Sequence, residues 1–192
     1  MALVGVVALG ALAATMTDSE VEATIEFGKT AKAKDFEGFT LEATHMSLIS
    51  RHDHIPEGPS PKLFLSTPWE RIARASMNAT AKHQSLTAGN VPESMRRPIL
   101  RVLCPGVQTT DWWIWTCNSV TLARGGRDDD IIQPTTAQLT ELEWQPSRRK
   151  ADAILATFPM DVLAVGNEFR ILLSTGATER ARIDAEIMAK LH

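Results

Sequence analysis

The chain has 192 residues, of which 20 are basic and 23 are acidic, so its formal charge at neutral pH is -3. Apolar residues make up 44% of the chain and charged residues 22%. These proportions exclude a disordered chain, a polytopic membrane protein and a basic nucleic-acid-binding domain, and the length fits one domain.

Residues 1–15, MALVGVVALGALAAT, form an uncharged apolar run of the length found in secretory signal peptides. The run is shorter than the roughly 20 apolar residues that a membrane-spanning helix needs, so we do not expect an integral membrane protein. The basic residue that usually follows the first methionine of a signal peptide is missing. We expect export to the periplasm or secretion, with cleavage near Ala14 or Thr15. A buried N-terminal strand or helix is the alternative.

The first half of the remaining chain shows a period of two, which predicts strands. Apolar and polar residues alternate over residues 20–27, as in a strand with one buried face. Further strands are predicted over 38–49 and 62–66. Residues 52–61 lie between them and contain three prolines and a glycine, which predicts a surface loop.

A helix is predicted to begin at residues 67–70, Thr-Pro-Trp-Glu. Threonine suits the N-cap, proline suits the first helical position, and glutamate three residues after threonine completes a capping box. Trp69 and Ile72 fall on the apolar side of this helix, whereas Glu70 and Arg71 fall on the polar side. One further helical turn is expected over 92–97.

The second half is again rich in predicted strands, with one predicted helix. Gly125-Gly126 indicates a hairpin turn. Residues 148–158 have a helix-forming composition, and residues 179–187 fit either a strand or a helix, of which we favour a strand leading into a short terminal helix. The remaining strands are expected over 99–103, 113–116, 120–123, 131–133, 137–144 and 168–174.

Together these elements predict a mainly β (α+β) fold, namely an antiparallel β-sandwich with two or three short helices inserted between its strands. We expect a single β-rich domain over 20–192, with a helical insertion near 67–97. An open parallel sheet fits poorly, because the chain lacks a helix after every strand and the glycine-rich turn of a nucleotide site.

The only two cysteines are Cys104 and Cys117. An oxidising compartment would favour a disulfide between them, and closing a loop of this size contributes about 3 kcal/mol of stability. In the cytoplasm they would instead be buried thiols. A zinc site at these cysteines is disfavoured, because no histidine lies near them in the sequence.

Metal-ligating residue types gather at His45, His52, Asp53 and His54. In an extended segment His52 and His54 project to the same side, and two imidazoles with a carboxylate can bind a divalent metal such as zinc, copper or nickel. The spacing matches no strong metal signature, and polar residues are common in proline-rich loops. We therefore expect no cofactor and keep a divalent metal as the alternative.

Three of the five tryptophans, Trp112, Trp113 and Trp115, lie within four positions. On a strand, Trp113 and Trp115 point one way and Trp112 the other, so one set can be buried while the other is exposed. An exposed indole surface would suit sugar rings, lipid headgroups or an apolar partner. Tryptophans that fill the core are the alternative.

Three adjacent carboxylates, Asp128, Asp129 and Asp130, follow the glycine pair. They could collect calcium, but calcium loops place their ligands at alternate positions. The pattern is more typical of a solvated turn.

Our leading hypothesis is an exported, non-enzymatic module that recognises an unknown protein or a cell-envelope component through a sheet face or loops. No nucleic-acid partner is expected. The alternative is a small metal-binding protein or metalloenzyme that uses the histidine cluster, and a third possibility is a structural or assembly domain of a larger complex.

Overall fold

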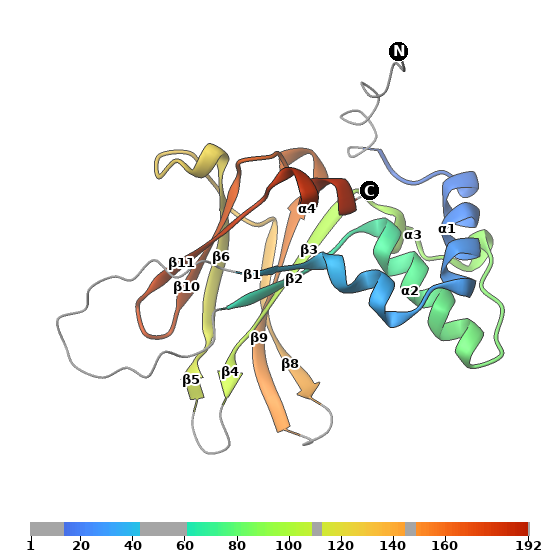
Figure 1. The fold of residues 1–192 in the computed structure, drawn as a ribbon, viewed down its shortest axis with the longest axis horizontal. Helices are drawn as coiled ribbons and strands as arrows, with labels where there is room; N and C mark the ends of the chain where they lie inside the picture. The colour runs from blue at the N-terminus through green and yellow to red at the C-terminus, as the bar shows by residue number, and fades with distance from the viewer. Residues whose placement is uncertain (1–13, 43–60, 109–112, 145–148, 192) are drawn as a thin grey trace, which may run out of the picture.

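Two antiparallel sheets form a sandwich in the computed structural model, which describes residues 14–42, 61–108, 113–144 and 149–191 (Figure 1). The five-stranded sheet has the order β1 (Thr40–Glu42), β2 (Lys62–Ser66), β3 (Ile99–Pro105), β9 (Arg149–Pro159) and β8 (Thr136–Trp144). The four-stranded sheet has the order β11 (Thr178–Arg182), β10 (Glu168–Leu173), β6 (Cys117–Ala123) and β7 (Ile131–Ile132). A short ribbon joins β4 (Val107–Gln108) to β5 (Trp113–Trp115). The predicted antiparallel β-sandwich of mainly β (α+β) class is confirmed.

The main core lies between the two sheets. Along β3, Leu100, Val102 and Cys104 are buried, while the residues between them are only partly buried. The rings of Phe158 and Phe169 meet across the sandwich with their centroids 5.7 Å apart. Alternation therefore gives each sheet one face toward the core and one face toward the outside.

Cys104 of β3 and Cys117 of β6 form a disulfide, with their Cα atoms 6.1 Å apart. Both cysteines are buried in the main core. Because β3 and β6 belong to different sheets, the bond links the two layers of the sandwich. The predicted disulfide is confirmed.

The prediction of a strand over 20–27 is wrong, because these residues lie in helix α1 (Asp18–Thr30). Its buried positions are Val21, Thr24, Ile25 and Gly28, which is the spacing of one helix face. Phe27, predicted to point inward on a strand, is 39% exposed. The alternating pattern was misleading because threonine and glycine also belong to the buried side.

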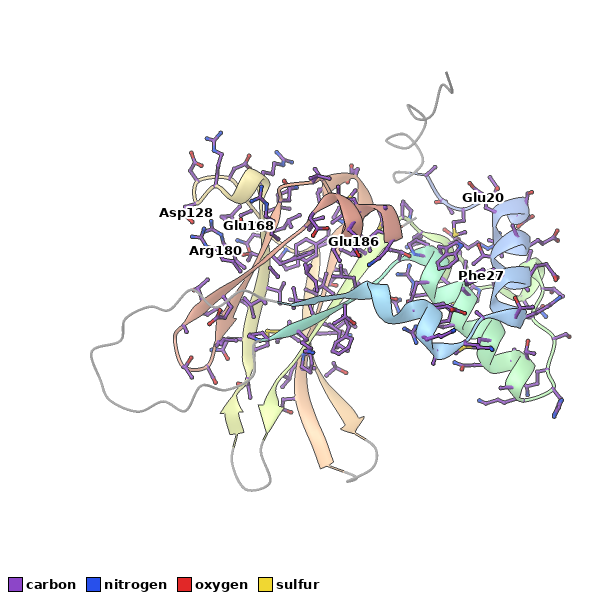
Figure 2. All side chains as sticks on the ribbon, in the orientation of Figure 1. Glu20, Phe27, Asp128, Glu168, Arg180 and Glu186 are labelled. Carbon is purple, nitrogen blue, oxygen red and sulfur yellow. A yellow bond between two sulfur atoms is a disulfide. The ribbon has the colours of Figure 1, made fainter. Side chains whose placement is uncertain are left out.

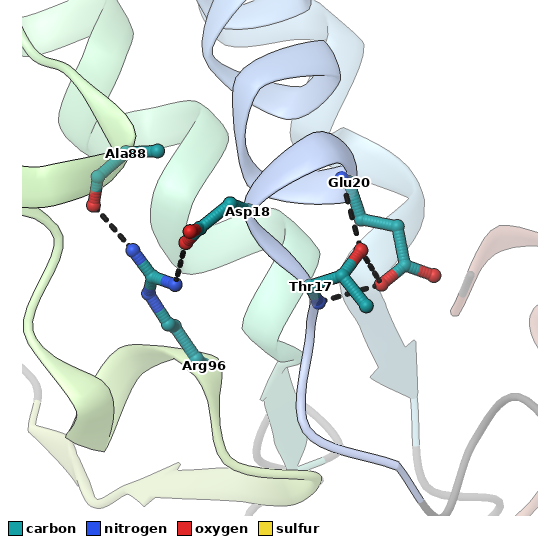
Figure 3. A network of polar contacts seen from close by, with 5 residues as sticks. All are labelled: Thr17, Asp18, Glu20, Ala88 and Arg96. Carbon is teal, nitrogen blue, oxygen red and sulfur yellow. Dashed lines mark hydrogen bonds and ion pairs between the residues drawn. The ribbon is translucent and has the colours of Figure 1, made fainter.

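A capping box starts α1 (Figure 3). The Glu20 backbone N–H donates to Thr17 Oγ1 over 3.3 Å, and the Thr17 backbone N–H donates to Glu20 Oε2 over 2.7 Å. Arg96 holds the same end of the helix by pairing with Asp18 and by donating to the Ala88 carbonyl. Local hydrogen bonds and one distant cation thus fix where the helix begins.

Thr17→Ala is expected to lower the free energy of unfolding by about 1 kcal/mol at neutral pH. The backbone and side chain of Thr17 donate to the Glu20 carboxylate and hold its pKa below the ordinary value of 4.5. A lowered folded-state pKa adds stability that is present above the ordinary pKa and is lost as the pH falls through the folded pKa. Urea unfolding at pH 7 and pH 3 should therefore show a smaller effect of Thr17→Ala in acid. Thr17→Ser is the control, and an equal loss at both pH values would contradict this role of Glu20.

Helix α2 (Pro68–Ala81) begins where the Thr-Pro-Trp-Glu pattern predicts. Thr67 Oγ1 accepts from the Glu70 backbone N–H over 3.2 Å, which confirms threonine as the N-cap. The predicted capping box is not completed, because the Glu70 carboxylate bonds to Ser66 Oγ and Arg74 instead. Glu70 and Arg71 are buried, however, so their placement on the solvent side was wrong. The helix buries a broader face than its apolar residues alone indicate.

The helices α1, α2 and α3 (Glu93–Arg96) lie together beside the sandwich (Figure 1). A second, smaller core joins them, made by Val21 and Ile25 of α1, Ile72 of α2, and Ala88 and Val91 of the following segment. The 3₁₀ turn η3 (Ala88–Asn90) contributes to that segment, and η2 (Ala33–Phe39) connects α1 to the sheet. The predicted helical turn over 92–97 is confirmed by α3.

The prediction of a helix over 148–158 is wrong, because β9 occupies this region. β9 pairs with β3 on one side and with β8 on the other. Ile154, Ala156 and Phe158 are buried in the core at a period of two. Pairing on both edges and burial in the sandwich override the helix propensity of the alanines.

The predicted glycine turn and the predicted C-terminal elements agree with the structure. The Gly125-Gly126 turn, 3₁₀ turn η4 (Arg124–Gly126), joins the antiparallel strands β6 and β7, and both glycines have positive φ. At the end of the chain, β11 leads into helix α4 (Ala185–Lys190), which confirms the favoured interpretation. The 3₁₀ turn η5 (Met160–Val162) follows β9.

The strand predicted over 38–49 is described only as β1, and residues 43–60, which include most of the predicted loop, lie outside the described residues. Within the described ranges, no helix has the length and apolar character needed to cross a bilayer.

Candidate ligand-binding groove

A groove of about 810 Å³ lies between α2 and the outward face of the five-stranded sheet. Strands β1, β2, β3, β8 and β9 supply one side, and α2 supplies the other. Its lining combines apolar side chains with four charged ones: Phe36, Thr40, Phe64, Leu65, Ser66, Glu70, Arg71, Arg74, Ala75, Asn78, Met95, Arg101, Leu103, Thr140 and Leu155. We call this hollow the groove below.

The floor of the groove is an apolar row across three neighbouring strands. Phe64 of β2 is the register partner of Leu103 of β3, and Leu103 is the partner of Leu155 of β9. Paired residues in a sheet share a face, so the three side chains stand side by side on the outer face. Phe64 is 37% exposed. The row therefore leaves apolar surface open to a ligand.

Arg71 of α2 forms the buried end of the groove and is only 7% exposed. Its Nη1 donates to the carbonyls of Ser66, at 2.8 Å, and Ile99, at 3.0 Å. Its Nε has no acceptor among the described residues. Burial lowers the pKa of Arg71 to about 10, and the nearby positive charge of Arg101 acts in the same direction.

Arg101 of β3 stands in the next row of the sheet, opposite Ser66. Ser66 is also the residue whose carbonyl accepts from Arg71, so the two arginines converge on the junction of β2 and β3. Within the part of the chain that the structure describes, no acidic side chain forms an ion pair with either of them. This end of the groove is electropositive.

Glu70 is the acidic residue of the lining, and its charge is already matched. Its carboxylate accepts from Ser66 Oγ over 2.6 Å and pairs with Arg74. The guanidinium of Arg74 also lies over the ring of Phe36, 4.5 Å from its centroid, and burial lowers its pKa. Three arginines against one glutamate leave the lining with an excess of two positive charges.

A second hollow of about 350 Å³ lies where α1 and α2 begin. Its lining is mostly apolar: Ala14, Met16, Glu20, Ala23, Thr24, Thr67, Pro68, Trp69, Pro98, Met160 and Leu191. Glu20, the charged member, is engaged in the capping box of α1. This hollow lacks the unmatched charges of the groove.

The site residues predicted from the sequence are not the ones that form the groove. His45, His52, Asp53, His54 and Trp112 lie outside the described residues. The backbones of Trp113 and Trp115 form β5 and pair with Gln108 and Val107, and nothing is described of their side chains. Across the described ranges, no three His, Cys, Asp or Glu side chains are grouped so that they could hold a metal ion.

The three adjacent aspartates each pair with an arginine. Asp128 lies between Arg170 of β10 and Arg180 of β11, and Arg180 also approaches Glu168 at 3.6 Å (Figure 2). The neighbouring two carboxylates pair with arginines of their own turn, Asp129 with Arg127 at 2.9 Å and Asp130 with Arg124 at 3.8 Å. The three carboxylates thus form ion pairs with different arginines and do not converge on one point, which favours a structural turn over a calcium site.

Sequence reasoning missed Arg71 and Arg101 as site residues. Arg101 carried a weak signal, because it interrupts an apolar strand at a position that must face outward. Arg71 carried none, since an arginine beside glutamate in a first helical turn ordinarily faces solvent. The two arginines meet only because α2 packs beside the five-stranded sheet.

Fold and groove together define a disulfide-linked β-sandwich with a helical layer and a ligand-sized hollow. No known protein family, characterised protein or solved structure matches the chain. The groove is therefore the basis for the functional proposal.

Proposed function

We propose that this chain is an exported, non-enzymatic binding module that acts in the periplasm or outside the cell and holds its ligand in the groove. The observation that carries the proposal is the groove itself, with a volume of about 810 Å³. Binding sites for small ligands typically measure about 300–1,000 Å³ and combine apolar walls with a few polar groups. The groove has both properties.

Export is supported by the disulfide between Cys104 and Cys117. Disulfides that bridge structural layers persist in oxidising compartments and are rare in the cytosol. The apolar run at residues 1–15 agrees with this location.

Binding rather than conversion is supported by the chemistry of the polar lining. Arginine stays protonated at neutral pH, and even the lowered pKa of Arg71, about 10, leaves it charged. Guanidinium groups therefore donate hydrogen bonds to a ligand and do not exchange protons with it. Glu70 is held by Ser66 and Arg74, which keeps its carboxylate engaged.

Blocking the floor of the groove is expected to weaken ligand binding by about tenfold or more. The neutral dye Nile red should bind the oxidised protein with one-to-one stoichiometry and gain fluorescence in the apolar row. Leu155→Trp fills that row and should raise the dissociation constant for Nile red by about tenfold or more. A tenfold increase corresponds to a loss of about 1.4 kcal/mol of binding free energy. Leu103→Trp should act in the same way.

Leu172→Trp is the matched control, because Leu172 is 39% exposed on β10 of the other sheet. It should leave Nile red binding unchanged, and unfolding curves should show that all three variants fold. Absence of dye binding in the wild type, or equal binding by Leu155→Trp and Leu103→Trp, would overturn the proposed function.

A further inference from the structure

Building on the proposed function, we propose that the ligand is an amphiphile with a single carboxylate, which Arg71 and Arg101 bind while its apolar body lies on Phe64, Leu103 and Leu155. The groove offers positive charge at one end and an apolar row along its floor. A molecule with one anionic group and an apolar body matches both features.

Arg71 is a buried cation without a charged partner among the described residues. The acceptors of its two Nη atoms are all backbone carbonyls, those of Ser66, Ile99, Met95 and Arg97. Its buried Nε is still without an acceptor there. Buried charges are ordinarily paired, because leaving one unpaired in a site of low polarity is costly. An anion in the groove would supply the missing partner.

Arg101 provides the second donor group. It is partly exposed on the outer face of β3, and its charge lowers the pKa of Arg71. Neither arginine forms an ion pair with Glu70, the acid at the same junction, which is paired with Arg74. The two like charges repel each other, and an anion between them would convert that repulsion into attraction. Arg74 does not compete for this role, because Glu70 neutralises it.

The apolar row fits a body of limited length. Phe64, Leu103 and Leu155 stand on three adjacent strands, which span about 10 Å at the usual spacing between strands. Arg101 lies two residues from Leu103 on the same strand, so the charged group and the row are neighbours on one sheet face. A carboxylate with a medium-length alkyl body can therefore contact both. The guanidinium of Arg101 can also match the planar carboxylate with two parallel hydrogen bonds.

The test is displacement of Nile red by four ten-carbon probes that differ in their headgroups: decanoate, decyl phosphate, 1-decanol and decyltrimethylammonium. Decanoate should compete about tenfold or more better than 1-decanol, and decyltrimethylammonium should be the weakest. Arg101→Gln should remove about tenfold of decanoate affinity and leave 1-decanol unchanged, while Arg101→Lys should restore part of the loss. Arg182→Gln, an exposed arginine on β11, is the control and should change nothing.

Three results would overturn the inference. Equal competition by decanoate and 1-decanol, or an Arg101→Gln variant that binds decanoate normally, would leave a groove that takes apolar ligands regardless of charge, and the proposed function would stand. Stronger competition by decyl phosphate than by decanoate would replace the carboxylate by a phosphate. If Nile red itself does not bind in the groove, the proposed function is wrong, and the inference that rests on it is wrong as well.

Discussion

Replacing Cys104 and Cys117 together with alanine is expected to lower the free energy of unfolding by about 3 kcal/mol. The disulfide closes a loop with a sequence separation of 13 residues and ties β3 to β6 inside the core. Without it, the unfolded chain gains conformational freedom, and the two sheets are held together by packing alone. Small domains are stable by only about 5–15 kcal/mol, so a loss of this size would remove a large part of the free energy of unfolding.

Urea unfolding followed by far-ultraviolet circular dichroism measures this loss directly. The wild type treated with a reductant should approach the stability of the double variant, and the reductant should not affect the variant itself. A wild type whose unfolding midpoint is the same with and without reductant would show that the disulfide does not form or does not stabilise the protein.

Gly28→Ala is expected to destabilise the protein by about 2 kcal/mol, although alanine is the better helix former. Gly28 is buried where α1 crosses α2, and a Cβ there would lie 2.4 Å from the Ala73 carbonyl oxygen and 2.6 Å from Ser76 Cβ. The same crossing holds a hydrogen bond from Ser76 Oγ to the Ile25 carbonyl, at 2.7 Å. A methyl group at Gly28 would force the helices apart and weaken that bond.

Gly89→Ala is the matched control for this prediction. A Cβ at Gly89 would meet nothing within 4 Å, so the variant should unfold at nearly the wild-type urea concentration. If Gly28→Ala proved as stable as the wild type, the close packing of α1 against α2 would be contradicted. Since α2 forms one wall of the groove, Gly28→Ala should also weaken Nile red binding.

The parts of the fold that sequence reasoning predicted correctly depend on local chemistry. Thr67 begins α2 because its side chain accepts a backbone hydrogen bond three residues on. The glycines at 125 and 126 form a hairpin turn because they adopt positive φ. The two cysteines formed the one pair available for a disulfide.

The two wrongly assigned elements, α1 and β9, arise where tertiary structure decides between helix and strand. In α1, Val21 and Ile25 fit both a strand and a helix, and the buried Gly28 that settles the question is not an apolar signal. In β9, alanines that favour a helix in isolation are paired on one side with β8, the preceding strand, and on the other with β3, which is distant in sequence. Neither outcome can be read from a short window of residues.

The candidate site was less predictable than the fold. The groove forms only when α2 packs beside strands that come from separate parts of the chain. Charged residues such as Arg71 look like ordinary surface residues until their burial is known. The tryptophans and histidines drew attention because they are chemically distinctive, and their role stays a prediction.

The most direct test of the central claim, that the groove is the ligand-binding surface, is nuclear magnetic resonance of the oxidised, isotopically labelled protein titrated with decanoate. The backbone amides of Phe64, Arg101, Leu103 and Leu155 should shift together and saturate with one dissociation constant. The amides of β10 and β11 on the other sheet should stay in place. Shifts gathered instead around Met16, Trp69 and Leu191 of the second hollow, or on the four-stranded sheet, would contradict the account.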